Sequence, residues 1–275
     1  MATDHTPSRI VSLQPSATVI LAAIGRLDRL VACTKYCADV CPEVAARNIT
    51  MVHDSWTADS EQIVNAHPDL VIAAVPYQEK AVAEILKAGA RFLGLAPKTL
   101  ADIYTDIAII SGVADAASRG EEITAEMKQT IEAMRQKTRS LPTPKVFCEE
   151  WGNPLIASQP WVAELIDTAG GKFIGTPGAQ TTIEAVREEN PDVLVAAWCG
   201  AGDRVPLEKI VNNRNWQKVR AVRDGRVYCI RDEYLNTPAP TLLLGLRALA
   251  AAIHPEEFPH PAGLRCITNV PAHAR

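Results

Sequence analysis

The chain has 275 residues, of which 47% are hydrophobic and 22% are charged, and its formal net charge is −4. These values are ordinary for a folded protein and argue against a disordered, fibrous or nucleic-acid-binding chain. No stretch approaches the roughly 18 consecutive apolar residues of a transmembrane helix, so we expect no membrane span. The seven cysteines, an odd number, favour free thiols in a reducing compartment over a purely structural set of disulfides.

The N-terminal part alternates short apolar runs with helical segments. The predicted strands are 9–13, 28–32, 70–75 and 91–95, and the predicted helices are 17–24, a helix that begins at Ser60, and 80–88. Strands that alternate with helices at this spacing favour a parallel sheet with crossover helices. We therefore expect an N-terminal α/β lobe over residues 1–113.

Helix-forming residues dominate the middle of the chain, residues 114–140. Ile123, Met127, Ile131 and Met134 recur at the spacing of one helical face. The segment therefore predicts one long connector helix, which ends where two prolines follow Leu141.

The strand–helix alternation resumes after the connector. The predicted strands are 145–148, 193–197 and 227–230, and the predicted helices are 161–169, 182–189 and 241–253, followed by an irregular tail from His254. This pattern predicts a C-terminal α/β lobe over residues 141–275. The expected fold is thus two parallel-sheet α/β lobes joined by one long connector helix, with a ligand cleft between the lobes.

One sequence pattern occurs in both predicted lobes. Residues 61–74, which begin with Glu61 and pass through Pro68-Asp69, align with residues 184–197, which begin with Glu184 and pass through Pro191-Asp192. Each glutamate stands near the start of a predicted helix, where the helix dipole favours a negative charge. From the residues alone, both glutamates could serve only their helices.

The order and spacing of these elements resemble the substrate-binding proteins of ABC importers that have a rigid helical connector. This branch of importers takes up cobalamin, ferric siderophores and haem. The similarity covers residues 9–256 and rests on the run from Arg9 to Ala17, the two glutamate units, the connector helix and Gly170–Gly171. The resemblance implies a two-lobed, monomeric protein that captures a large chelate and presents it to a membrane permease and its ATPase.

The resemblance also implies a docking site and a compartment. Glu61 and Glu184 match the surface glutamates with which each lobe of these proteins docks onto basic residues of the permease. Such proteins act in the periplasm or cell envelope. The first thirteen residues lack a basic segment followed by an apolar one, so we find no signal peptide and the cytoplasm is the alternative compartment.

The cobalamin-binding members of this family give the most similar ligand pattern. Tyr36, Trp56 and Asp232 fall where those proteins have a tyrosine, a tryptophan and an aspartate near the ligand. Further aromatic residues follow predicted strands, where open α/β sheets bind ligands, namely Tyr77, Trp151, Trp198 and Tyr234. Flat aromatic side chains suit a large macrocycle, although Trp198 could instead pack within its lobe.

We therefore expect cobalamin or a related corrinoid as a non-covalently bound ligand. A ferric siderophore, haem or a metal ion is the alternative.

Three cysteines recur four residues apart, at Cys33, Cys37 and Cys41. With the nearby His53 they could hold a metal ion or an iron–sulfur cluster, but their spacing matches none of the usual cysteine patterns for such sites. Two of them could instead form a disulfide, or all three could remain free thiols. A second possible set of metal ligands is His53 with Glu149, Glu150, Cys199 and Asp232.

Catalysis is the main competing function. Glu149 and Glu150 with Asp232 could in principle act as general acids and bases. However, the chain has no nucleophile elbow, no phosphate-binding loop, no dinucleotide fingerprint and no zinc-protease motif. We therefore expect a binding protein and not an enzyme, with no catalytic residues. A cytoplasmic corrinoid or metal carrier that is not coupled to transport is the second alternative.

Overall fold

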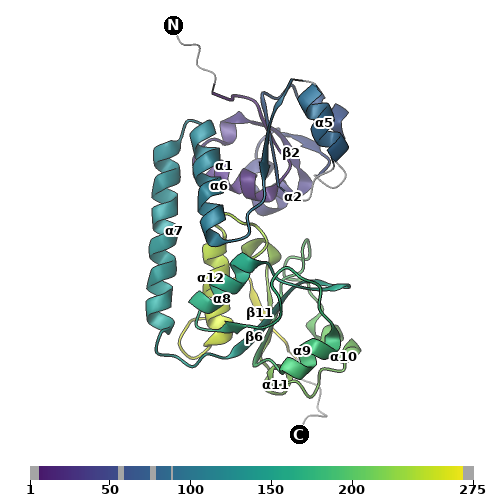
Figure 1. Ribbon diagram of the computed structural model, residues 1–275, viewed down its shortest axis with the longest axis vertical. Helices are drawn as coiled ribbons and strands as arrows, with labels where there is room; N and C mark the ends of the chain where they lie inside the picture. The colour runs from purple at the N-terminus through teal and green to yellow at the C-terminus, as the bar shows by residue number, and fades with distance from the viewer. Residues whose placement is uncertain (1–5, 55–58, 75–78, 88, 269–275) are drawn as a thin grey trace. The chain divides into compact units, whose positions relative to one another are not determined.

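The computed structural model describes residues 6–54, 59–74, 79–87 and 89–268. The chain divides into two compact units, which we call the first lobe (Met1–Glu126 with Pro238–Pro240) and the second lobe (Met127–Thr237 with Thr241–Arg275). Each lobe is an α/β unit with one sheet and helices on both of its faces (Figure 1). The expected pair of α/β lobes is therefore confirmed.

The sheet of the first lobe is parallel throughout, in the order β3-β2-β1-β4-β5. Its strands are β1 (Ile10–Ser12), β2 (Leu30–Thr34), β3 (Thr50–Val52), β4 (Leu70–Ala74) and β5 (Arg91–Leu95). Every residue of β1 and β4 is buried, because helices cover both faces of these central strands. Strand β3 is the one member of this sheet that the sequence did not predict.

The helices of the first lobe are α1 (Pro15–Ala23), η1 (Leu27–Arg29), α2 (Lys35–Val40), α3 (Pro42–Ala45), α4 (Ser60–Asn65), α5 (Glu79–Lys87) and α6 (Leu100–Val113). In Figure 1, α1 and α6 lie on one face of the sheet and α5 on the other. Helix α6 was not predicted, although a capping box starts it. The Thr99 hydroxyl accepts the Asp102 N–H, and the Asp102 carboxylate accepts the Thr99 N–H.

The chain passes from the first lobe to the second within one helix, α7 (Ala117–Thr138). The predicted helix over 114–140 is confirmed to within three residues at each end. Ile123, Met127 and Ile131 are buried along its length, as their spacing predicted. Near its start Gly120 packs on Ser111, since a Cβ at Gly120 would lie 2.0 Å from the Ser111 Oγ.

The sheet of the second lobe is parallel only in its centre. Its strands are β6 (Lys145–Gly152), β7 (Leu155–Ala157), β8 (Lys172–Phe173), β9 (Val193–Ala196), β10 (Val227–Ile230) and β11 (Leu264–Cys266), in the order β11-β10-β9-β6-β7 with β8 paired to β6. The expected parallel pairing holds for β6, β8, β9 and β10. Strands β7 and β11, neither of which the sequence predicted, run antiparallel to their neighbours β6 and β10. Strand β11 also shows that the tail is not wholly irregular.

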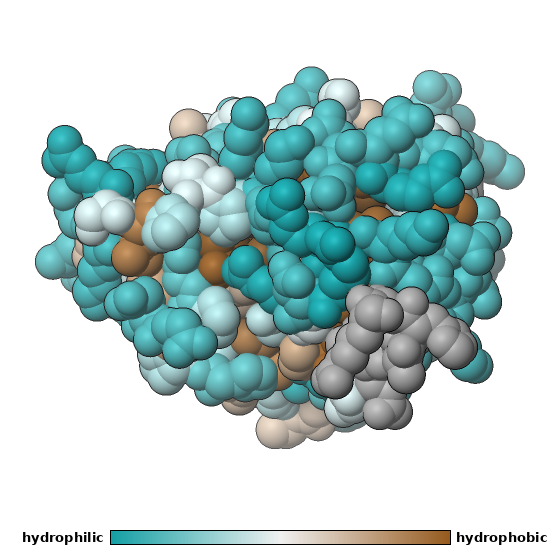
Figure 2. Space-filling model, turned by 90° about the horizontal axis from the view of Figure 1, so that it is seen from below, coloured by the Kyte–Doolittle hydropathy of each residue, from teal (hydrophilic) through white to brown (hydrophobic). Residues whose placement is uncertain are grey.

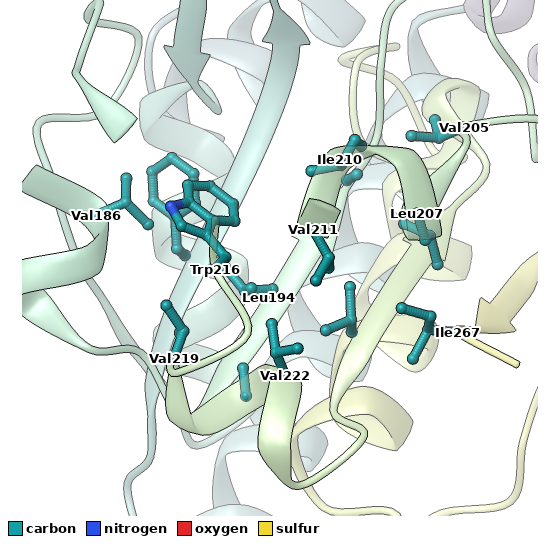
Figure 3. Close-up of a cluster of buried hydrophobic side chains, with 14 of the residues drawn as sticks. Val186, Leu194, Val205, Leu207, Ile210, Val211, Trp216, Val219, Val222 and Ile267 are labelled. Atoms are coloured by element: carbon teal, nitrogen blue, oxygen red, sulfur yellow. The ribbon is translucent and has the colours of Figure 1, made fainter. Parts of the chain in front are cut away.

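The helices of the second lobe are α8 (Pro160–Thr168), α9 (Ile183–Glu189), α10 (Leu207–Asn213), α11 (Arg220–Arg223), η2 (Asp232–Tyr234) and α12 (Leu242–Ile253). One core of this lobe lies around Trp216, whose side chain is 1% exposed and stands beside Val186 and Leu194 (Figure 3). The Trp216 ring packs edge-on against Phe147, with the ring centroids 6.5 Å apart. A cavity of about 10 Å³ in this core has room for a single water molecule.

Polar side chains cover most of the molecular face shown in Figure 2, and apolar side chains come to the surface in separate small areas. In the parts of the chain that the structure describes, no helix has both the length and the apolar character needed to cross a bilayer.

Candidate functional site

Four predicted ligand residues lie at the carboxyl edge of the second lobe's sheet. Trp151 is the second-last residue of β6, Trp198 follows β9, and Asp232 and Tyr234 lie in η2, directly after β10. Because β6, β9 and β10 are parallel, their carboxyl ends meet at one edge. This is the edge at which open α/β sheets bind ligands.

Trp151 is the most exposed of these side chains, with 43% of its surface accessible. Its indole N–H donates to the carbonyl of Asn153 (2.9 Å), in the turn that joins β6 to β7. The donor is thus used within the hairpin, and what the side chain presents to solvent is the apolar surface of its ring. An exposed indole in this state is suited to stacking on a flat ligand.

Trp198 has the opposite environment and is partly buried. Its indole N–H donates to Glu149 Oε1 (2.9 Å), and its ring packs on Gly152, where a Cβ would lie 2.3 Å from the ring. The ring also packs against the core of the lobe. These contacts give Trp198 the packing role that the sequence left open, and ligand contact by this residue stays a prediction.

Asp232 holds a neighbouring turn in place. Its carboxylate accepts the backbone N–H groups of Gly200 (2.8 Å) and Gly202 (2.7 Å). Burial raises the pKa of Asp232, against the lowering effect of these two donors. Nearby, the Tyr234 ring lies close to the backbone of Gly263, where a Cβ would be 2.4 Å from the ring. Both residues therefore shape the edge at which Trp151 lies.

Glu150 and Cys199 complete this edge. The Cys199 N–H donates to the Glu150 carbonyl (3.1 Å), and the Glu150 carboxylate accepts the Gln159 side-chain amide (2.6 Å). Burial raises the pKa of Glu150. Desolvation, with the charges of Glu150 and Asp232, raises the pKa of Cys199 to about 12. At neutral pH Cys199 is therefore a thiol and not the more nucleophilic thiolate.

In the first lobe, Tyr36 lies in the first turn of α2, directly after strand β2. Its side chain is 37% exposed, and the Lys35 ammonium lies 4.8 Å from its ring centroid. The Thr34 hydroxyl caps the helix by accepting the Cys37 N–H. Tyr36 is thus positioned at the carboxyl edge of this lobe's parallel sheet. Trp56 and Tyr77 lie outside the described residues.

The three spaced cysteines of the first lobe, Cys33, Cys37 and Cys41, are all buried free thiols. A hydrogen bond with Cys37, together with burial, raises the pKa of Cys33. The Cys41 thiol donates to the Glu43 carboxylate (3.3 Å), and His53 is exposed. Over the described part of the chain, no three His, Cys, Asp or Glu side chains are placed to hold a metal ion together. The cysteine set of the first lobe therefore lacks support, whereas the set that would join His53 of the first lobe to residues of the second lobe stays a prediction.

Glu61 and Glu184 lie in corresponding places of the two lobes. Each lies in the first turn of a short helix, α4 or α9, and each is exposed. A polar side chain caps both helices, Asp59 for α4 and Thr182 for α9. Neither glutamate carboxylate has a hydrogen-bond or ion-pair partner within the described ranges, so both charges face solvent.

A buried ion pair is the main feature that sequence reasoning missed. Arg214 donates to Glu149 Oε2 (2.6 Å), and the two residues are 7% and 2% exposed. Burial raises the pKa of Glu149, while Arg214 and the Trp198 N–H lower it. The sequence marked Glu149 as a possible acid, base or metal ligand. Nothing in it pointed to Arg214, which lies 65 positions away.

Comparison with known proteins identifies the family to which this fold belongs. The sequence profile of a family described as "Periplasmic binding protein" matches residues 10–234. The uncharacterized ABC transporter substrate-binding lipoprotein YvrC of Bacillus subtilis is 25% identical over 265 residues, which are 92% of this chain and 82% of that protein. The vitamin B12-binding protein of Vibrio vulnificus is 27% identical over 249 residues, 86% of this chain and 87% of that protein.

Two solved structures share the fold over most of its length. A periplasmic heme binding protein from Pseudomonas aeruginosa has a TM-score of 0.86 at 20% identity, with 96% of this chain and 99% of that chain covered. The periplasmic vitamin B12 binding protein BtuF of Vibrio cholerae has a TM-score of 0.73 at 25% identity, with 90% and 97% covered. The resemblance inferred from the sequence is confirmed for family and fold.

Proposed function

Because this chain belongs to the periplasmic binding protein family, we propose that it is the substrate-binding protein of an ABC importer and that its ligand is cobalamin or a related corrinoid. The observation that most supports a corrinoid ligand is the match to the vitamin B12-binding protein of Vibrio vulnificus, at 27% identity over 86% of this chain. The relatives named above are binding proteins, which supports capture without catalysis.

The carboxyl edge of the second lobe offers chemistry that suits a corrinoid. A corrinoid is a large flat macrocycle with amide side chains around its rim. The exposed ring of Trp151 can stack on the flat face. The carboxylate oxygens of Glu150 and Asp232 can accept hydrogen bonds from the amides at the rim.

Further contacts belong to the same proposal. Tyr36 and Tyr234 lie after strands of their own lobes, and Trp56 and Tyr77 were assigned from the sequence alone. We assign all four to the ligand site, with the three tyrosines as further apolar and hydrogen-bonding surface.

Delivery to the importer is the second part of the proposal. Glu61 and Glu184 would each contact basic residues of the permease, which acts together with its ATPase. Exposed ion pairs are weak one at a time, so two of them act mainly by steering and orienting the protein on the permease. The protein would work as a monomer in the periplasm or cell envelope.

Calorimetric titration tests the ligand. We expect cyanocobalamin to bind one-to-one with a micromolar or lower Kd, and haemin and a ferric hydroxamate siderophore to bind at least about tenfold more weakly. Trp151→Ala should weaken cyanocobalamin binding at least about tenfold, whereas Trp151→Phe, which keeps a flat ring, should retain most of the affinity. Tight binding of haemin or the siderophore without corrinoid binding would overturn the proposed ligand, but it would not affect the assignment of the chain to its family.

A further inference from the structure

The buried pair of Glu149 and Arg214 is costly for the lobe to maintain. Its charges lie 2.6 Å apart in a place where their side chains are almost fully shielded from water. Moving two charges out of water costs free energy that their attraction does not always recover, and an apolar pair of similar volume is often as stable. The ion pair therefore adds little to the stability of the lobe. Its hydrogen bonds indicate a second role, which is to fix the end of strand β6.

Those bonds converge on the end of strand β6. The second guanidinium nitrogen of Arg214 donates to the Gly152 carbonyl (3.2 Å). The Trp198 N–H donates to the other oxygen of Glu149, and the Trp198 ring packs on Gly152. One buried network thus fixes the strand at Glu149 and at Gly152, on either side of Trp151.

A β-bulge lies between these two fixed points. In the pairing of β6 with β7, Glu149 faces Ala157 but Trp151 faces Ile156, so β6 has one extra residue there. In a regular strand Glu149 and Trp151 would point to the same face. With the bulge, Glu149 is 2% exposed and Trp151 is 43% exposed. Bulges commonly redirect a side chain in this way beside functional sites.

We propose that Glu149 and Arg214 are positioning residues that hold the bulged end of β6 so that Trp151 presents its ring to a flat macrocyclic ligand. Arg214 suits this role because its rigid guanidinium donates from one nitrogen to the Glu149 carboxylate and from the other to the Gly152 carbonyl. The ligand in this proposal rests on the proposed function, whereas the geometry of Trp151 rests on the second lobe alone.

The test uses a double variant, Glu149→Met with Arg214→Met. A single variant would leave an unpaired buried charge and unfold the lobe, but the apolar pair removes both charges together. A control that replaces an exposed pair on a different element, helix α7, by Glu132→Met with Arg135→Met removes one negative and one positive charge outside β6. Urea unfolding shows whether the variants are folded before any binding is measured.

The first readout needs no ligand. Protein labelled with 5-fluorotryptophan gives a fluorine signal for each of its five tryptophans, and Trp151→Phe identifies the signal of Trp151. We expect this signal to be sharp in the wild type and the α7 control, and shifted and broadened in the double variant. The signal of Trp161, whose N–H donates to the Leu235 carbonyl, should stay unchanged in all of them. An unchanged Trp151 signal in the double variant would overturn the proposal.

The second readout is cyanocobalamin affinity. Trp151→Ala should weaken binding at least about tenfold in the wild type but less than about twofold in the double variant, because there the ring is already misplaced. An equal loss in both backgrounds would show that the pair does not act through Trp151. If the wild type binds no corrinoid, the proposed ligand fails, and the fluorine spectra still decide the positioning role.

Discussion

The two lobes contain the same helix–turn–strand unit, from α4 to β4 in the first lobe and from α9 to β9 in the second. In both units a left-handed residue ends the helix and a proline follows it. This residue is His67 in the first lobe, with a φ of 48°, and Asn190 in the second, with a φ of 47°. The conformation breaks the helix and directs the chain into the next strand.

The aspartate after the proline has the same task in both units. Asp69 accepts the backbone N–H groups of Ser8 and Arg9, just before β1, and Asp192 accepts that of Lys145, the first residue of β6. The turn therefore explains why proline and aspartate recur. It does not explain Glu61 and Glu184, which touch none of these groups. The comparison thus separates the proline and aspartate, which the turn requires, from the two glutamates, which the turn does not require.

The largest expected effect comes from the two aspartates. Asp69→Ala and Asp192→Ala should each lower the free energy of unfolding by about 2–3 kcal/mol, because each removes charge-assisted hydrogen bonds to a central strand. Asp192→Ala should cost more, since Asp192 also pairs with the charged Arg220 (2.6 Å), whereas the further donor to Asp69 is the neutral Ser8 hydroxyl (3.1 Å). Urea unfolding near neutral pH measures both, with the exposed Glu121→Ala as control. If either variant lowered the free energy of unfolding by less than about 0.5 kcal/mol, the two aspartates would not have the same role in their turns.

The dependence of stability on pH tests the role of the Asp192 carboxylate further. Burial opposes ionisation of this carboxyl, but the Lys145 N–H and the Arg220 guanidinium outweigh it and lower the pKa of Asp192. A lowered pKa in the folded state gives a stabilisation that is complete above the unfolded value of about 3.9 and is lost as pH falls through the folded pKa. The stability difference between wild type and Asp192→Ala should thus be constant from about pH 5 to 8 and shrink below about pH 4. A difference that grows on acidification would contradict it.

Local sequence signals were sufficient for most of the fold. The alternation of apolar runs and helices predicted the central strands of both sheets, and the Ile123, Met127 and Ile131 spacing predicted α7. These features depend on neighbours in the chain. Strand β11 could not be predicted in this way, because Leu264–Cys266 is a strand only through pairing with β10, which lies far away in the sequence.

The candidate site shows the same limit. Trp151 and Trp198 both follow predicted strands, and both were predicted to contact the ligand, with packing inside the lobe as the alternative for Trp198. The structure separates them, because a bulge turns Trp151 outward while Gly152 leaves room for the Trp198 ring to pack inside. Neither the bulge nor the partnership of Glu149 with Arg214 has a local signal. The sequence could place these two tryptophans near the ends of strands, but it could not predict how their side chains are oriented.

The residues that end the two helices should respond to glycine with opposite signs. Glycine adopts a positive φ without the strain of about 1–2 kcal/mol that other residues carry there, so His67→Gly should stabilise the protein by about 0.5–1 kcal/mol. Asparagine already tolerates this conformation, and the Asn190 Oδ1 accepts the Arg220 N–H (2.8 Å). Asn190→Gly should therefore destabilise the protein by about 0.5–1 kcal/mol. Urea unfolding of both variants measures the effects, and two shifts of the same sign would contradict the prediction.

The smallest effect on the folded protein should come from the two glutamates. Glu61→Ala and Glu184→Ala should each change the free energy of unfolding by less than about 0.5 kcal/mol, because exposed first-turn carboxylates contribute only a weak helix-dipole term. Cyanocobalamin affinity should stay within about twofold, since neither residue belongs to the proposed ligand site. Uptake of radiolabelled cobalamin by cells that carry the importer should nevertheless fall at least about tenfold in the double variant. Charge reversal with Glu61→Lys and Glu184→Lys should abolish uptake, and Glu121→Lys on α7 is the matched control. If the glutamate variants lost ligand affinity while uptake followed that loss in proportion, the residues would serve the ligand site instead of the permease.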